Sequence, residues 1–278
     1  MKKWIESCIF LPTYLNEKKL MRHLSGKTIL ITGASSGIGA QVIYQLADVH
    51  CHLILVARNE ERLSAIKNEI ESKASATVNI YKADLRNEEQ MGAFLDFLHS
   101  FPKGIDIVVN NAGLSINRSI FESLDRFHDF SRTMAINYFA PVQLLLSMIP
   151  ALRSKHGQII NVSSVNVRLA PVPYFSAYQA SKSAYDVFLR SVAPELRRSG
   201  VVVSSIYLPL VRTPMIEPTS AYKKVPAMSP QHAAKIICKN MYTKKKKYQP
   251  WWLLFGQIAS IFMESFRDFT KRDKRGSL

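Results

Sequence analysis

The stretch Lys27-Thr-Ile-Leu-Ile-Thr32, followed by Gly33-Ala-Ser-Ser-Gly37-Ile-Gly39, decides the fold of this chain. Its apolar run is typical of a buried strand, and the residues after the glycines are helical to about Val49. Glycines let the backbone approach a ligand, and the free N–H groups and dipole of a helix N-terminus attract phosphate. The stretch predicts the phosphate-binding turn of a cofactor site, with an ordinary tight turn as the alternative. The expected contacts come from Gly33, Ser35, Ser36, Gly37, Ile38 and Gly39.

The second apolar run is His52–Ala57, and Arg58 follows it directly. An acidic residue at that place would bind the ribose 2′-hydroxyl of NAD, whereas an arginine accommodates the 2′-phosphate of NADP. Arg58, with Ser35 or Ser36 nearby, therefore favours NADP(H). The alternative is a surface arginine at the start of a helix.

Apolar runs and helical patterns alternate along the rest of the chain. Further strands are expected at Thr77–Tyr81, Ile105–Asn110, Gly157–Ser163 and Val201–Leu208. Helices are expected at Asn59–Lys73, Asn87–Ser100, Leu124–Leu152 with a bend near Pro141, Ser176–Ser199 and Ser229–Tyr242. Such alternation builds a parallel sheet with right-handed crossovers and helices on both faces. The expected fold class is α/β: a doubly wound parallel sheet of the Rossmann type, forming one three-layer α/β/α domain over residues 26–243.

Small and polar residues follow two of these strands at their carboxyl ends, where ligands bind in such sheets. Asp84 and Leu85 come after the third strand, where the adenine of a cofactor could be held. Asn110, Ala112 and Gly113 end the fourth strand, where small residues allow close approach of the backbone to a ligand.

The segment Tyr178-Gln-Ala-Ser-Lys182 lies in the first turns of the helix expected at Ser176–Ser199. The spacing of four residues places Tyr178 and Lys182 on one helix face. A free phenol has a pKa near ~10, and a nearby ammonium stabilises the phenolate and lowers that pKa. The pair is typical of a proton donor and its electrostatic partner, although most pairs with this spacing are solvated helix surface.

Five motifs in this order resemble those of the short-chain dehydrogenase/reductases, a family of nicotinamide-dependent enzymes. They are T-G-A-S-S-G-I-G at 32–39, N-N-A-G at 110–113, Asn137, Ser163-Ser164 and Y-Q-A-S-K at 178–182. The resemblance covers roughly residues 26–240 and implies the same doubly wound sheet.

The resemblance also implies a role for each residue of the site. Tyr178 would be the catalytic acid/base, and Lys182 would tune it and hold the nicotinamide ribose. Ser164 would orient the substrate carbonyl, with Ser163 as a minor alternative because the spacing to Tyr178 is one residue longer than expected. Asn137 would hold a water that links Lys182 to solvent. The nicotinamide carboxamide and the pyrophosphate would meet Pro209, Val211 and Thr213.

A narrower resemblance, to the bacterial fatty acyl-CoA reductases and related lipid-reducing enzymes, covers residues 113–230. It rests on segments such as GQIINVSS at 157–164 and YLPLVRTPMIEPTSAYKKVPAMSP at 207–230. It implies hydride transfer from NADPH to a carbonyl of a long-chain acyl or lipid-like substrate, with fatty acyl-CoA to aldehyde favoured. The alternative is a ketone/alcohol oxidoreductase acting on a 3-keto lipid or a steroid-like substrate. A homo-oligomer, either a dimer or a tetramer, is also expected.

Cysteine and histidine spacing is not that of a metal site, so no metal is expected. The three cysteines, Cys8, Cys51 and Cys238, argue against a disulfide framework and fit a reducing, cytoplasmic compartment. The N-terminal stretch is too polar for a convincing signal peptide, and no run reaches the ~18 apolar residues of a membrane span.

The net charge of +16 is concentrated at the two ends of the chain. Residues 1–27 hold six basic and two acidic side chains, and residues 244–278 hold nine basic and three acidic ones. Because the middle is only mildly basic and carries no nucleic-acid-binding motif, binding to nucleic acid is not expected. A non-enzymatic NADP-binding scaffold is a further alternative, which an incomplete catalytic set would favour.

Both ends combine basic and apolar residues, so we expect an N-terminal extension over 1–25 and a basic, aromatic-rich tail over 244–278. Lys244–Lys247 precede Trp251–Phe255, and then Ile258, Ile261, Phe262 and Phe266 follow. Trp4, Ile9, Phe10 and Leu11 lie beside Lys2 and Lys3. This order predicts peripheral docking on the inner membrane surface. The competing interpretation is that Trp251–Phe266 packs over the substrate cleft or a subunit interface.

Overall fold

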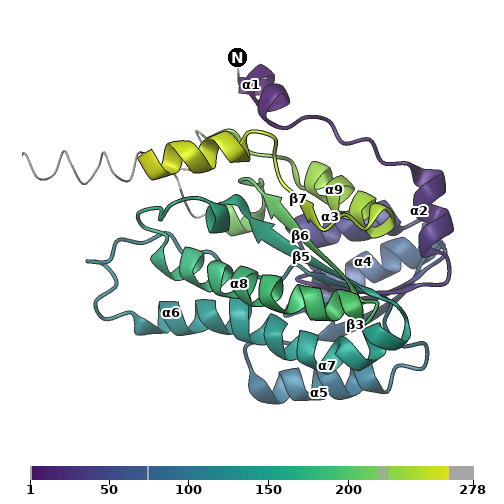
Figure 1. Ribbon diagram of the computed structural model, residues 1–278. Helices are drawn as coiled ribbons and strands as arrows, with labels where there is room; N and C mark the ends of the chain where they lie inside the picture. Colours follow the sequence, from purple (N-terminus) through teal and green to yellow (C-terminus); the bar gives the residue numbers. More distant parts are fainter. Residues whose placement is uncertain (1, 74, 218, 220–221, 223–224, 263–278) are drawn as a thin grey trace, which may run out of the picture.

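A seven-stranded sheet between two layers of helices forms the body of the protein (Figure 1). The computed structural model describes residues 2–73, 75–217, 219, 222 and 225–262, except for the side chains of 2–5 and 73. The strands are β1 (Thr28–Thr32), β2 (His52–Ala57), β3 (Thr77–Lys82), β4 (Ile107–Asn110), β5 (Gln158–Ser164), β6 (Val202–Leu208) and β7 (Lys247–Tyr248). The helices are α1 (Lys2–Ile9), α2 (Glu17–Leu24), α3 (Gly37–Leu46), α4 (Glu60–Lys73), α5 (Glu88–His99), α6 (Phe127–Met134), α7 (Ala140–Ser154), α8 (Ser176–Arg198) and α9 (Pro230–Thr243).

The strand order is β3-β2-β1-β4-β5-β6-β7, and every pair is parallel. The order reverses direction between β1 and β4, which is the place where ligands bind in doubly wound sheets. The predicted fold class is therefore confirmed. The expected strand and helix limits differ from the observed ones by up to three residues, as is usual at element ends.

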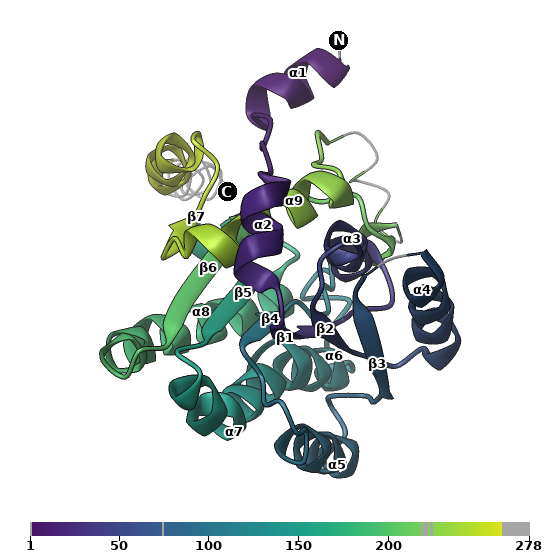
Figure 2. The ribbon, with the colours of Figure 1, turned by 90° about the vertical axis from the view of Figure 1, so that its right-hand side faces the viewer.

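Two hydrophobic clusters hold the layers together, one on each face of the sheet. α2, α3, α4 and α9 cover one face, whereas α5, α7 and α8 cover the other (Figure 2). The strands of the centre are buried on both faces, so β1 reads as an uninterrupted apolar run flanked by threonines. This burial fixes the glycine-rich turn that follows β1.

The long helical region expected at Leu124–Leu152 is present but starts at Phe127 and includes a π-helical turn, η1 (Ala135–Phe139). The turn lies directly before Pro141, where a bend was expected, and it contains Asn137. By length and composition alone this 28-residue helix could cross a membrane, although it contains no unbroken run of about 18 apolar residues. One side of the helix packs on the sheet, with Leu144 and Leu152 buried, whereas Phe139 and Leu146 on its other side are exposed.

The described residues before β1 and after α9 pack against the domain. Leu20 and Leu24 of α2 are buried against the sheet-side cluster of α3 and α9. β7 extends the sheet beyond residue 243, where the tail was expected to begin. A further helix, Leu253–Phe262, follows it. Of the apolar tail residues, Phe266 lies outside the described part of the chain.

Candidate active site

The glycine-rich turn after β1 is shaped by close packing against the loop that follows β4. Gly33 has a φ of +64°, and a Cβ there would lie 2.9 Å from Ala112 Cα. Gly37 has a φ of +57°, and a Cβ there would lie 3.0 Å from Thr213 Cγ2. Only glycine fits both requirements at these positions, so the turn brings three strand ends into contact.

Asn111 ties the two loops together. Its Nδ2 donates to the carbonyl oxygens of Thr32 at 3.0 Å and Gly33 at 3.2 Å. The hydroxyl of Thr32 in turn accepts from the backbone N–H groups of Asn111 and Ala112. Asn110, which was expected to contact the cofactor, has a buried side chain that is a hydrogen-bond partner of Tyr185.

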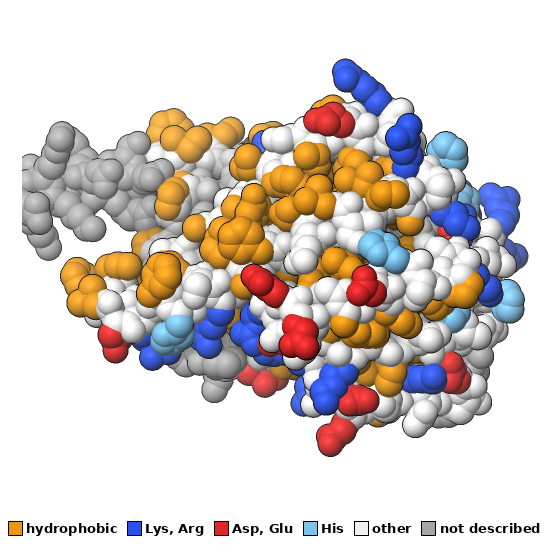
Figure 3. Space-filling view, turned by 90° about the horizontal axis from the view of Figure 1, so that it is seen from below, with side chains coloured by type: hydrophobic (Ala, Val, Ile, Leu, Met, Phe, Trp, Pro, Cys, Tyr) orange, Lys and Arg blue, Asp and Glu red, His pale blue; other side chains and the backbone are white. Residues whose placement is uncertain are grey.

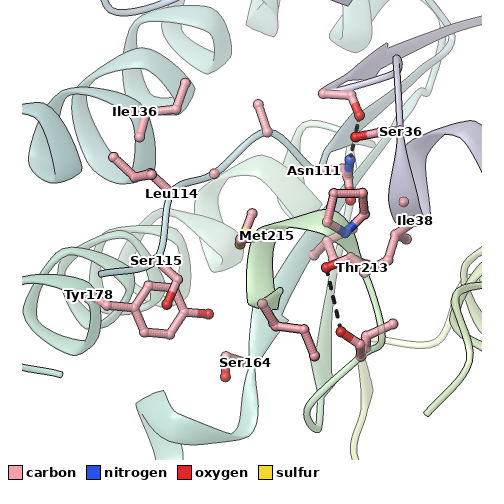
Figure 4. Close-up of a pocket in the computed structure, with 18 of the residues that line it drawn as sticks. Ser36, Ile38, Asn111, Leu114, Ser115, Ile136, Ser164, Tyr178, Thr213 and Met215 are labelled. Carbon is pink, nitrogen blue, oxygen red and sulfur yellow. Dashed lines mark hydrogen bonds between the residues drawn. The ribbon is translucent and has the colours of Figure 1, made fainter. Parts of the chain in front are cut away.

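A cavity of about 920 Å³ lies over the carboxyl ends of the strands. Most of the residues expected from the sequence line it: Gly33, Ser35, Ser36, Gly37, Ile38, Arg58, Asp84, Leu85, Ala112, Gly113, Ser163, Ser164, Tyr178, Lys182, Pro209, Val211 and Thr213. Figure 4 shows the glycine turn with Ser36 and Ile38 at one end and Tyr178 with Ser164 at the other. Three expected residues, Gly39, Asn110 and Asn137, lie behind this wall.

Gly39 acts through packing. A Cβ there would come within 2.3 Å of the Gly33 carbonyl oxygen and within 2.9 Å of Asn111 Nδ2. The residue therefore lets α3 approach the turn. The N-cap residue of α3, Ser36, makes no side-chain hydrogen bond to the helix, so its hydroxyl does not cap the first-turn N–H groups beside the cavity.

The end of the cavity beyond β2 is strongly basic. Arg58, Arg62 and Arg86 all line it. Arg86 is already paired with Asp84 through contacts of 2.5–3.1 Å, and its hydrogen bonds hold the pKa of that carboxyl below the ordinary value. Arg58 directly follows β2 and Arg62 lies in the first turn of α4, so both line the same end of the cavity. Arg62 was not among the expected residues, although its place in the first turn of the helix that follows Arg58 could have indicated it.

Tyr178 and Ser164 lie together at the opposite end, beside Ser115 (Figure 4). Burial raises the pKa of the Tyr178 phenol, and the hydrogen bond with Ser164 acts in the opposite direction. A lowered pKa was expected from the nearby ammonium, and this direction is wrong because burial dominates. Ser164 Oγ also accepts from Asn166 N at 3.2 Å. Ser163 Oγ, by contrast, is buried with no hydrogen-bond partner among the described residues.

Lys182 reaches the base of the cavity from α8. Its ammonium donates to the carbonyl oxygen of Val162 at 3.3 Å, and burial lowers its pKa to about 8. A Cβ on Gly113 would lie 3.4 Å from Lys182 Nζ and 3.0 Å from Asn137 Oδ1. Lys182 and Asn137 are therefore neighbours across a glycine that leaves them room.

The buried side chain of Asn137 connects its own π-helical turn with the loop after β4 and with α8. Its Nδ2 donates to Leu114 O at 2.8 Å and to Ser181 Oγ at 3.0 Å, and its Oδ1 accepts from Leu114 N at 3.0 Å. The π-helical turn carries this amide into the core, where it holds the loop after β4 against α8. Its contacts thus support a role for Asn137 in positioning the loop after β4 against α8.

Aromatic and apolar side chains surround Tyr178 on the remaining side. Phe175 is T-shaped to Tyr178 with ring centroids 6.4 Å apart, and it stacks on Tyr222 at 6.0 Å. Burial raises the pKa of Tyr222 to about 12, so this phenol stays neutral at ordinary pH. Further apolar lining comes from Leu114, Ile136, Val172, Met215, Ile216 and Val225. This part of the cavity suits an apolar ligand.

Comparison with known proteins assigns the chain to a protein family. A family model described as short chain dehydrogenase matches residues 27–224. A fatty acyl-CoA reductase from Acinetobacter baylyi is 42% identical over 246 residues, which cover 88% of this chain and 82% of that protein. Another from Mycobacterium tuberculosis is 38% identical over 228 residues, which cover 82% and 77% respectively.

A solved structure agrees with the relatives. The L-sorbose reductase of Gluconobacter frateurii, crystallised with NADPH and L-sorbose, superposes with a TM-score of 0.69 at 26% identity. The match covers 78% of this chain and 90% of that protein. With the doubly wound sheet, the glycine turn and the Ser164–Tyr178–Lys182 arrangement, these findings show that the chain is an oxidoreductase that belongs to the short-chain dehydrogenase family.

Proposed function

We propose that this protein uses NADPH to reduce the carbonyl of a long-chain acyl substrate, with conversion of a fatty acyl-CoA to an aldehyde as the favoured reaction. The observation that carries the proposal is that Ser164 and Tyr178 lie in one part of the cavity, next to a wall of apolar and aromatic side chains. Two relatives with 42% and 38% identity are named fatty acyl-CoA reductases, which supports the same substrate class.

The residues present fit NADPH along the whole cavity. Gly33 and Gly37 leave backbone room for the pyrophosphate beside the N-terminus of α3. Arg58 and Arg62 supply the charge that a 2′-phosphate needs. Lys182 and Thr213 would hold the ribose and the carboxamide of the nicotinamide. The solved relative with NADPH supports this choice.

When bound, NADPH supplies a hydride to the carbonyl carbon. Tyr178 donates its phenol proton to the carbonyl oxygen, so that no unpaired negative charge accumulates there. Ser164 donates a hydrogen bond to the same oxygen, and the buried Lys182 ammonium stabilises the phenolate that remains. With a thioester the product is a hemithioacetal, which releases the thiol and leaves the aldehyde. No cysteine nucleophile is needed.

The alternative is reduction of a ketone on a 3-keto lipid or steroid-like substrate. The same catalytic residues would serve it, and the apolar wall formed by Phe175 and Tyr222 would suit it equally. The chemistry at the carbonyl separates the two, because only a thioester releases a thiol.

The experiment is an assay of NADPH oxidation with long-chain acyl-CoAs, 3-keto lipids and small ketones, with identification of each product. The proposal expects the highest kcat/KM with long-chain acyl-CoA and an aldehyde as its product. A keto lipid that is reduced while acyl-CoA is left intact would establish the alternative. Tyr178→Phe serves as the control for non-enzymatic oxidation.

A further inference from the structure

The helix Leu253–Phe262 exposes its apolar face, which is unusual for a helix in contact with water. Its inward face holds Leu253, Gly256, Gln257 and Ser260, of which only Leu253 is a large apolar side chain. Its outward face is entirely apolar. The exposed side chains and their exposed fractions are Leu254 (56%), Phe255 (65%), Ile258 (52%), Ile261 (61%) and Phe262 (70%). A surface helix of a globular protein normally has the opposite arrangement.

The inward face fixes this helix to the wall of the active-site cavity. Ser260 Oγ accepts from Ala170 N at 3.1 Å, and Leu253 is fully buried against Val165 and Tyr207. A Cβ on Gly256 would meet Leu169 at 3.7 Å. The segment 165–172 that receives these contacts also provides Asn166 and Val172 to the cavity lining. The helix is therefore anchored, and its exposure is a property of the fold.

The surroundings of the helix add further apolar and basic groups. Trp251 is 56% exposed, stands T-shaped to Phe255, and donates its indole N–H to Cys8 O in α1 at 3.2 Å. Lys244–Lys247 are all exposed and precede it by a few residues. Figure 1 shows the helix in yellow on the side toward which β5 and β6 point. In Figure 3 hydrophobic side chains gather at that end of the molecule.

We infer that this outward face inserts into the headgroup region of an anionic lipid membrane. The ten-residue helix is too short to span a bilayer, so it would lie in the plane of the interface with its apolar face down. Exposed lysines near the surface add attraction to anionic headgroups. The cavity wall attached to the helix then faces the phase into which long acyl chains partition. This inference does not depend on which carbonyl is reduced.

A membrane suits this face better than a second copy of the chain. In a two-fold dimer the same patch meets itself, which would bring the Lys244–Lys247 runs of the two copies toward each other. Protein interfaces also carry roughly one hydrogen bond per 100–200 Å², and the outward face offers no polar side chain for this purpose. Lipid requires only apolar burial and cationic neighbours.

The test is flotation of the full-length protein with phosphatidylcholine vesicles, with and without phosphatidylglycerol, at low and high salt. The inference expects binding that requires phosphatidylglycerol and weakens with salt. The double variant Phe255→Ser/Ile258→Ser should lose about tenfold or more in partitioning, because two large apolar side chains no longer enter the interface. Leu146→Ser, on α7 and 59% exposed, is the matched control and should bind as the wild type does.

Two outcomes would overturn the inference. One is that the wild type ignores anionic vesicles at low salt. The other is that Phe255→Ser/Ile258→Ser binds as well as the wild type. Size-exclusion chromatography and activity on a water-soluble carbonyl accompany each variant. A wild-type dimer that ignores vesicles and becomes monomeric in the double variant would instead identify a second copy as the occupant of this face.

Discussion

Tyr178 is the residue on which the chemistry depends. Its ring packs against Phe175, whereas its hydroxyl meets Ser164 in the cavity. Tyr178→Phe keeps the ring and removes the proton donor. We predict a loss of kcat of roughly 10²–10⁴-fold, with NADPH affinity changed little. Steady-state kinetics together with a fluorescence titration of NADPH would measure both. A variant with near-normal turnover would remove Tyr178 from its assigned role.

Titration of Lys182 should lower the reduction rate at alkaline pH. Burial lowers its pKa to about 8, so the ammonium is present below that pH and is lost above it. Because the charged form stabilises the phenolate, kcat/KM for reduction should fall as the pH rises through about 8. The measurement is a pH–rate profile with a saturating cofactor. The side chain of the Lys182→Arg variant keeps its charge at alkaline pH, so any residual activity of this variant should not fall as the pH rises through about 8. A wild-type profile that stays flat to pH ~10 would contradict the prediction.

Arg58 and Arg62 should set the preference for NADPH over NADH. Each can donate charge-assisted hydrogen bonds to a 2′-phosphate, worth roughly 1.5–3 kcal/mol. We therefore predict that Arg58→Ala and Arg62→Ala each reduce the preference by about tenfold or more, measured as the ratio of kcat/KM values. Lys67 on α4 is half-buried, pairs with Glu71 and does not line the cavity, so Lys67→Ala provides the control. Preference for NADH in the wild type would refute this assignment.

Sequence patterns identify a residue well when its chemistry is local. Tyr178, Lys182 and Ser164 were found because a motif carries each of them, and all three meet in the cavity. Asn111 and Tyr222 were not singled out, since the role of each depends on a partner far away in the chain. Asn111 bonds Thr32 across 79 residues, and Tyr222 stacks on Phe175. Such contacts have no signal in a single sequence.

The start of α6 is held by one buried carboxylate. Asp129 Oδ2 accepts from Arg118 and Arg126, both at 3.1 Å, and Oδ1 pairs with Arg132 at 2.7 Å. Burial acts to raise the pKa of Asp129, but its pairs with Arg126, Arg132 and His128 overcome this and lower it. Because Arg118 also donates its backbone N–H to Tyr174 O, the cluster ties the loop after β4 to the segment before α8.

We predict that Asp129→Asn lowers the free energy of unfolding by about 1–3 kcal/mol, because three guanidiniums lose a buried partner. The folded pKa lies below the ordinary value near ~3.9, so the stabilisation is present above that pH and is lost as the pH falls through the folded pKa. Urea unfolding at neutral pH and near pH 3 would measure it. The difference between variant and wild type should shrink in acid. The exposed neighbour Asp125→Asn should have little effect at either pH.

Elements were predictable where burial makes a strong pattern. β1 and β2 were found because strands buried on both faces are nearly continuous apolar runs, and β6 was found although Ser204 and Ser205 interrupt its apolar run. β7 was missed because two residues within a lysine-rich run carry no such pattern, and only pairing with β6 makes them a strand. The π-helical turn was likewise not predicted, since Ala135–Phe139 has an ordinary helical composition.

The two ends of the molecule converge on the same region although they are far apart in sequence. Glu6 of α1 pairs with Arg212, close to Thr213 at the cavity, and Trp251 bonds Cys8. The described parts of both ends therefore contact the domain. Fold and catalytic centre follow from local motifs, whereas the placement of the ends follows from contacts more than 200 residues apart.

Reduction of a thioester by NADPH is tested most directly by counting free thiol against NADPH consumed. Purified protein is incubated with palmitoyl-CoA and NADPH, and thiol release, NADPH oxidation and aldehyde are followed in the same sample. The expected result is one thiol and one aldehyde for each NADPH, with no release in Tyr178→Phe. NADPH oxidation on a ketone substrate, with palmitoyl-CoA left intact and no thiol released, would contradict the assignment.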